Sequence, residues 1–139
     1  MPDPVSPRNN AMAVAASALK AQQSRMRVIA ENIANAQSTA LTPGGEPYRR
    51  QIPVFQAREI NGATGVSLAE VRADQGDFRS EYDPSHPAAN AEGYVLRPNV
   101  DTLIEAMDMR EAQRAYEANL NVIETARSMD SRTLDLIKK

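Results

Sequence analysis

The chain has 139 residues, a formal net charge of −2, and neither cysteine nor tryptophan. Its mixed charges form no basic stripe of the kind that nucleic-acid binding requires, and the lack of cysteine excludes disulfides and thiol chemistry. No run approaches the roughly 18 apolar residues that a membrane span needs. The first residues also lack a charged stretch followed by an apolar core, so we expect no cleaved secretory signal.

The first predicted element is a long helix over residues 6–37. Ser6 is expected to cap it with Pro7 in its first turn, or Asn9 or Asn10 to cap it instead, while the run Thr42-Pro43-Gly44-Gly45 breaks the pattern. At about 1.5 Å per residue these 32 residues give a helix roughly 48 Å long. Apolar and small residues alternate steps of three and four, which keeps one seam facing a partner helix. That seam contains Met12, Ala15, Leu19, Gln22, Met26, Ile29, Ile33 and Ala36.

Short strands and turns are predicted after this helix, and five of the six aromatic residues lie among them. A strand is expected over residues 48–55, with Pro53 at an edge because proline cannot donate to a ladder. Asn61 and Gly62 indicate a turn. The apolar alternation that follows changes phase at Ala69, which predicts a β-bulge or a twisted strand.

The next segment is predicted to fold back on itself. Gln75-Gly76-Asp77 is expected to be a hairpin turn leading into a strand that ends at Tyr82. Residues 83–87 contain two prolines and are therefore expected to be extended. Residues 93–96 are a candidate last strand. These runs are short and few, so they predict only a small sheet or a pair of hairpins.

A second long helix is predicted from Asn99 to Ile137, roughly 57 Å, because no proline or glycine follows Pro98. Asn99 is its expected N-cap, with Asp101 and Glu105 favouring the positive helix end. It carries two adjoining apolar stripes, which indicate neighbours on more than one side. One stripe contains Met109, Ala112, Tyr116, Ile123, Ala126 and Ile137, and the other Ala112, Ala115, Val122, Ala126, Met129 and Leu136.

Residues that could carry chemistry are sparse. Asp83, Ser85 and His86 lie within four residues, whereas a catalytic triad must converge from distant positions, so we expect a rigid loop here and no catalysis. A single histidine without cysteine makes a zinc site improbable. Asp74 and Asp77 flank a glycine and are expected to form a turn. No catalytic residue, metal site or cofactor is expected.

Three asparagines lie near helix seams. Asn32 and Asn35 bracket Ile33, and Asn119 occupies the corresponding region of the second helix. Either they are solvated polar positions, where asparagine often ends a helix, or they are buried amides that fix the register of packed helices. Periodicity alone leaves both readings open.

Several of these motifs carry a family resemblance. Residues 30–35, followed by a Pro-Gly turn and Pro47-Tyr48-Arg49-Arg50, resemble the N-terminal signature of the flagellar axial proteins of rod, hook and hook-associated type. Residues 114–119 resemble the matching C-terminal signature. Residues 82–90, 93–95 and 97–101 resemble the proximal rod members. The resemblance covers essentially the whole chain, and the one departure is a lengthened turn over residues 42–48.

The resemblance implies a structural subunit that polymerises through its terminal helices in the periplasm and passes torque from the membrane base to the hook. It implies export through the flagellar type III apparatus, unfolded and with an uncleaved signal. The implied partners are further copies of the chain, the rod proteins FlgB, FlgF and FlgG, and the base adaptor FliE. No nucleic acid and no direct membrane span are expected.

We therefore predict a mainly α fold: a discontinuous helical assembly domain (residues 1–38 and 98–139, packed as a coiled-coil-like pair) with a small β-rich insertion (residues 39–97). The helix-packing residues are predicted to be Met12, Leu19, Met26, Ile29, Ile33, Tyr116, Leu120, Ile123 and Met129. Asn32, Asn35 and Asn119 are predicted to fix register. Loop contacts with the insertion or a neighbouring subunit are assigned to Asp83, Pro84, His86, Pro87 and Asn90.

Two other functions remain open from the residues alone. A generic coiled-coil adaptor or scaffold would show the same periodicity but would form a stable small oligomer by itself. A small enzyme built around Asp83 and His86 would lose activity on His86→Ala with its assembly intact.

Overall fold

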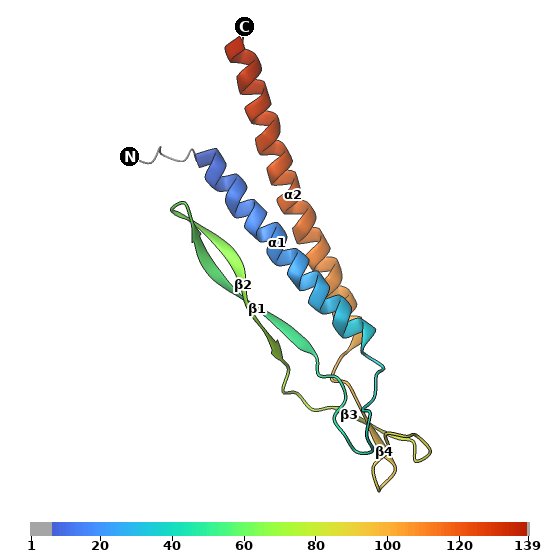
Figure 1. The fold of residues 1–139 in the computed structure, drawn as a ribbon. Helices are drawn as coiled ribbons and strands as arrows, with labels where there is room; N and C mark the ends of the chain where they lie inside the picture. Colours follow the sequence, from blue (N-terminus) through green and yellow to red (C-terminus); the bar gives the residue numbers. More distant parts are fainter. Residues whose placement is uncertain (1–6, 139) are drawn as a thin grey trace.

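A computed structural model describes residues 7–138 as two long antiparallel helices joined by a region of short strands (Figure 1). The helices are α1 (Pro7–Ala34) and α2 (Thr102–Lys138). The strands are β1 (Gln51–Ile60), β2 (Ala63–Ala73), β3 (Arg79–Tyr82) and β4 (Tyr94–Arg97). Helix α1 lies between the β1–β2 hairpin and α2, and it contacts both. The predicted architecture of two terminal helices with a small antiparallel strand region between them is confirmed.

The helix boundaries follow local capping chemistry. Pro7 is the first residue of α1, and the predicted cap Ser6 lies outside the described residues. Helix α1 ends at Ala34, slightly before the predicted end, and a turn over residues 35–37 follows. The prediction that Asn99 caps α2 is wrong. The cap is Asp101, whose carboxylate accepts hydrogen bonds from the backbone N–H groups of Leu103 (3.0 Å) and Ile104 (3.4 Å).

The β1–β2 hairpin confirms two local predictions. Its two-residue turn consists of Asn61 and Gly62, both with positive φ (51° and 83°), the geometry that asparagine and glycine tolerate best. Along the hairpin, Val54 pairs with Glu70 while the next residue pairs with Leu68. Ala69 is therefore the extra residue of a β-bulge, at the position where the apolar alternation changes phase.

The predicted hairpin turn at Gln75-Gly76-Asp77 is wrong. Strand β3 pairs with β4 and not with β2, so the sheet region consists of two separate two-stranded sheets. The β3–β4 pair is closed by Tyr82 and Tyr94, whose rings meet edge to face at 5.3 Å. Residues 74–77 are instead held by side chains from other segments, because the carbonyl groups of Asp74 and Gly76 accept hydrogen bonds from Asn99.

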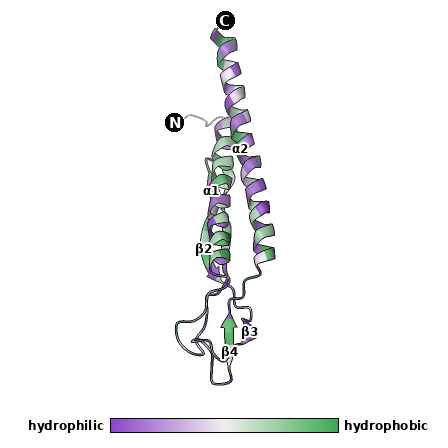
Figure 2. Ribbon diagram, turned by 90° about the vertical axis from the view of Figure 1, so that its right-hand side faces the viewer, coloured by the Kyte–Doolittle hydropathy of each residue, from purple (hydrophilic) through white to green (hydrophobic). Residues whose placement is uncertain are grey.

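The core is small and built mainly from small side chains. The buried apolar residues are Ala15, Ala21, Val28, Ile29, Ala36, Ala88, Val95, Val100 and Ala112. In α2 only Glu105 and Ala112 are fully buried, so the described residues leave most of its surface uncovered. Hydrophobic and hydrophilic residues alternate along the full length of both helices (Figure 2). A single copy therefore leaves much of its apolar surface in contact with water.

Candidate assembly surfaces and a buried polar joint

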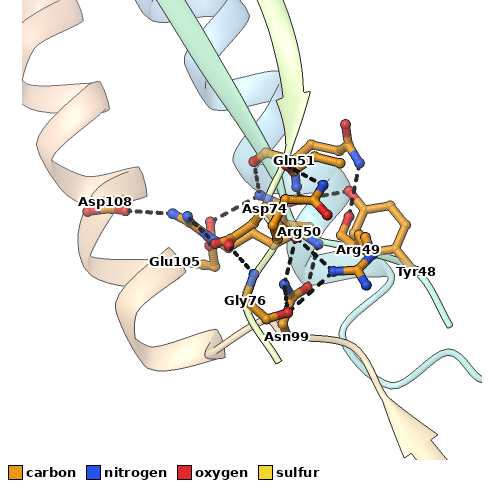
Figure 3. A network of polar contacts seen from close by, with 12 residues as sticks. Tyr48, Arg49, Arg50, Gln51, Asp74, Gly76, Asn99, Glu105 and Asp108 are labelled. Carbon is orange, nitrogen blue, oxygen red and sulfur yellow. Dashed lines mark hydrogen bonds and ion pairs between the residues drawn. The ribbon is translucent and has the colours of Figure 1, made fainter. Parts of the chain in front are cut away.

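A network of polar contacts lies where the start of β1, the end of β2 and the start of α2 meet α1 (Figure 3). We call it the polar joint and define it by Asn32, Tyr48, Arg50, Gln51, Asp74, Asn99 and Glu105. Two of its members, Asn32 and Glu105, are the two polar side chains among the fully buried residues described, each 1% exposed. Buried polar groups are stable only when they are hydrogen-bonded, and here both are.

Asn32 links α1 to the first residue of β1. Its Nδ2 donates to the carbonyl oxygen of Gln51 (2.9 Å), and its Oδ1 accepts from the backbone N–H of Gln51 (2.8 Å). The Tyr48 hydroxyl donates to the same Oδ1 at 2.6 Å. Through these bonds one side chain from the helix fixes where the strand begins. The solvated reading of Asn32 is wrong, whereas its role in setting register between helices stays a prediction.

Arg50 and Glu105 form the charged centre of the joint. Arg50 Nε donates to Glu105 Oε1, and the Arg50 guanidinium also lies 3.4 Å from Asp74 and 3.8 Å from Asp108. Asn32 reaches the second oxygen of Glu105 at 3.5 Å. Burial alone would lower the pKa of Arg50, but the hydrogen bonds and charges of Glu105 and Asp74 outweigh it and raise the pKa. The arginine therefore stays charged and holds three carboxylates together.

Asn99 and Arg49 close the other side of the joint. Asn99 Oδ1 accepts from the backbone N–H of Arg50 at 2.7 Å, and its amide donates to two carbonyl groups just after β2. Arg49 donates to the same two carbonyl groups, and its guanidinium lies 4.2 Å above the ring of Phe78. The residue expected to cap α2 thus connects segments that are far apart in the sequence.

The same environment changes the pKa of the Tyr48 hydroxyl. Burial raises the pKa of its hydroxyl, and the nearby charges of Glu31 and Glu105 raise it further. The group therefore remains protonated and can donate to Asn32 at neutral pH.

The predicted helix-packing residues differ widely in exposure. Ile29 is buried, and the half-buried members are Met12, Leu19, Met26, Tyr116 and Ile123. Ile33 (38% exposed), Leu120 (36%) and Met129 (54%) lie largely at the surface. The helices contact each other along their length, and polar contacts from α1 to α2 come from Arg25, which pairs with Glu111, and from Asn32. Each of these residues precedes a predicted seam residue by one position. Packing of the exposed members against other subunits stays a prediction.

The C-terminal half of α2 presents apolar side chains to water. Its exposed large apolar residues are Val122, Met129, Leu134, Leu136 and Ile137. Helix α2 has 37 residues and α1 has 28, so at about 1.5 Å per residue α2 is roughly 14 Å longer. Figure 1 shows that the C-terminal end of α2 extends past the start of α1. The part of α2 beyond the start of α1 therefore has no helix beside it among residues 7–138.

The other two asparagines of the family motifs bond to a carbonyl group four residues earlier, Asn35 just after α1 and Asn119 within α2. Asn35 donates to the Glu31 carbonyl (2.8 Å), and Asn119 donates to the Ala115 carbonyl (2.9 Å). Both are half-buried and make no defined hydrogen bond to another element. Their predicted role in register stays untested.

The loop over residues 83–90 bonds mainly to itself and to the β3–β4 hairpin. The Ser85 hydroxyl donates to the Asp83 carboxylate (2.9 Å), while His86 Nδ1 accepts from the backbone N–H of Ala88 (3.0 Å). Asn90 Oδ1 accepts from the backbone N–H groups of Glu92 and Tyr94. Serine and histidine are thus not hydrogen-bonded to each other, as a triad would require. Pro84 and Pro87 are exposed in this loop, and contact of the loop with a neighbouring subunit stays a prediction.

Sequence reasoning missed Glu105 as a buried residue because acidic side chains near a helix start are usually solvated. One signal was available: Glu105 lies seven residues before Ala112 and therefore shares its apolar line on α2. The sequence shows Arg50 only as part of the family motif Pro47-Tyr48-Arg49-Arg50. Nothing in the local sequence shows that Arg50, Asp74 and Glu105 converge.

Comparison with known proteins identifies the class of protein. Residues 12–40 match the family model described as flagella basal body rod protein. Residues 91–136 match the model described as flagellar basal body rod FlgEFG protein C-terminal. The two matches cover the helical ends that the polar joint holds together. They define a flagellar axial protein of the rod class.

Relatives that match this chain along nearly their whole length identify the family more closely. The flagellar basal-body rod protein FlgC of Agrobacterium fabrum is 46% identical over 134 residues, covering 95% of this chain and 96% of the relative. FlgC of Escherichia coli O6:H1 is 43% identical (91% and 96% covered), and FlgC of Bacillus subtilis is 38% identical (90% and 95% covered). The chain belongs to the FlgC family of flagellar basal-body rod proteins.

The chain is therefore a structural protein of the flagellar basal body, a subunit of its proximal rod, and not an enzyme. It associates with other components of the rod. Within residues 7–138, no helix has both the length and the apolar character needed to cross a bilayer. Over the same residues, no group of side chains has the composition of a metal site.

Proposed function

We propose that the chain polymerises in the periplasm through its terminal helices and connects the membrane base to the distal rod and hook. The observation that carries the proposal is the unpaired C-terminal end of α2, where Leu134, Leu136 and Ile137 are 56–75% exposed. Several large apolar side chains exposed at one helix end favour an interaction site there. Neighbouring subunits would bury it by coiled-coil-like packing, the mode that the heptad seams favour.

We further propose that residues 1–38 and 98–139 act as the assembly domain and residues 39–97 as an insertion that the polar joint holds in place. Torque transmission then requires stiffness from many close contacts, each individually weak. The joint contributes because Asn32 of α1 hydrogen-bonds to Gln51 of β1, and Arg50, next to β1, makes a charged hydrogen bond to Glu105 of α2.

The partners that fit this role are other copies of the chain, the rod proteins FlgB, FlgF and FlgG, and the base adaptor FliE. Delivery through the flagellar type III export apparatus without a cleaved signal peptide belongs to the same proposal. Its support is the family membership.

The test is a triple substitution of the α2 end, Leu134→Ser, Leu136→Ser and Ile137→Ser, in the chromosomal gene. We expect cells that export the protein but lack rod, hook and filament, scored by motility and by electron cryotomography of basal bodies. The control is Arg132→Ser with Asp135→Ser, which removes exposed charges from the same turns and should leave motility intact. Complete rods in the apolar triple variant would contradict assembly through this end.

A further inference from the structure

A groove of about 530 Å³ runs between α1 and the β1–β2 hairpin, and cations line it. Lys20 and Arg27 contribute from α1 and Arg58 from β1, while Val66 and Leu68 of β2 add an apolar wall. No acidic side chain lines the groove. The positive charge of these three side chains is therefore not neutralised by acidic side chains of the groove itself.

The three cations are free to bind an external partner. All three side chains are exposed, and in the part of the chain that the structure describes no ion pair involves any of them. Lys20 and Arg27 are seven residues apart, which is about 10.5 Å along the helix and about 20° around it. They therefore face the same side of α1.

Helix α2 carries the complementary pattern. Glu117 and Glu124 are also seven residues apart, both are exposed, and neither has an ion pair within residues 7–138. At about 100° per residue, Glu117 lies about 140° around the helix from Ala112, which is completely buried. The two glutamates thus point away from the protein's own core and are available to a neighbour.

We propose that the groove binds α2 of a second copy of this chain, with Lys20 facing the neighbour's Glu124 and Arg27 facing its Glu117. The inference rests on the proposed self-assembly and names one of its interfaces. Copies that are joined by the same contact along a tube all have the same orientation relative to the tube axis. Because α1 and α2 are antiparallel within a copy (Figure 1), the neighbour's α2 runs antiparallel to α1 in the groove, which sets this pairing.

Charge reversal with rescue tests the proposal in a flagellated strain that lacks the chromosomal gene. The pair Lys20→Glu/Arg27→Glu is expected to reduce swimming to the level of the deletion strain, and so is the pair Glu117→Lys/Glu124→Lys. The fourfold variant restores the attraction and should recover at least half of the wild-type swimming rate. The control Asp77→Lys/Glu92→Lys changes the net charge by the same amount at exposed acids away from the groove and should swim normally.

A cross-linking experiment keeps the proposal falsifiable if one variant fails to fold. The chain contains no cysteine, so Lys20→Cys with Glu124→Cys should give disulfide-linked dimers and longer ladders in oxidised, isolated basal bodies. Lys20→Cys with Glu92→Cys should give none.

The outcomes separate this interface from the broader proposal. Normal swimming of both charge-reversed pairs, a fourfold variant no better than either pair, or no ladder from the first cysteine pair would each overturn the groove as the site. If the gene deletion still abolishes the rod in those cases, the proposed function stands and only this interface is wrong.

Discussion

Replacing Arg50 by methionine tests whether the polar joint stabilises the fold. The substitution keeps an apolar stem but removes the guanidinium that contacts Glu105, Asp74 and Asp108. Glu105 is 1% exposed, so its carboxylate would remain buried without a counter-ion. Asn32 at 3.5 Å would be its one remaining defined side-chain partner.

The expected cost is large for a chain with so small a core. Removing one partner of a buried ion pair typically costs about 3–5 kcal/mol, because the remaining charge is desolvated and uncompensated. Domains are usually stable by about 5–15 kcal/mol in total. Arg50→Met should therefore lower the free energy of unfolding by about a fifth of the whole or more.

The measurement is urea denaturation followed by far-ultraviolet circular dichroism of the monomer. The double variant Arg50→Met/Glu105→Gln removes the buried charge and should recover about half of the loss. The control Arg72→Met breaks a pair with Glu70 in which both side chains are more than half exposed, and it should cost less than about 1 kcal/mol. A loss below about 1 kcal/mol for Arg50→Met, or a double variant less stable than the single, would refute the reasoning.

Three further predictions concern other parts of the fold. The pKa of the Tyr48 hydroxyl is raised, so its contribution to stability is present below about pH 10, where the unfolded side chain is protonated, and is lost as pH rises above that value. Wild type should therefore lose more stability between pH 9 and pH 11 than Tyr48→Phe does. The control Tyr82→Phe should follow wild type. Gly93 has a φ of +91° and an added Cβ would lie 3.0 Å from the Tyr82 ring, while Gly62 has a φ of +83° with open space around it. In thermal melts Gly93→Ala should therefore lower the free energy of unfolding by about 1 kcal/mol more than Gly62→Ala does. Equal losses would contradict the crowding at Gly93. Amides of residues 130–138, where every side chain but the first is exposed, should exchange rapidly in the dilute monomer and slowly in isolated basal bodies, and full protection in the monomer would contradict ordering on assembly.

The sequence by itself determined the elements whose signals are local. Heptad periodicity and the absence of proline after Pro98 predicted both long helices, Asn61 and Gly62 predicted the hairpin turn, and the phase change at Ala69 predicted the bulge. The family motifs, which lie at the helical ends, determined the rod class. Each of these signals depends on residues a few positions apart, so a single sequence contains them.

Only the tertiary structure decided the pairing of β3 with β4, the place of the hairpin against α1, and the polar joint. Asn99 has the residue type of a helix cap, yet it bonds to Arg50, 49 positions earlier in the chain. Glu105 has the residue type of a solvated first turn, yet it is buried, because Arg50 and Asn32 supply the charge and hydrogen bonds that its burial requires. Such partners meet only after the chain has folded, so no local pattern of residue types could have paired them.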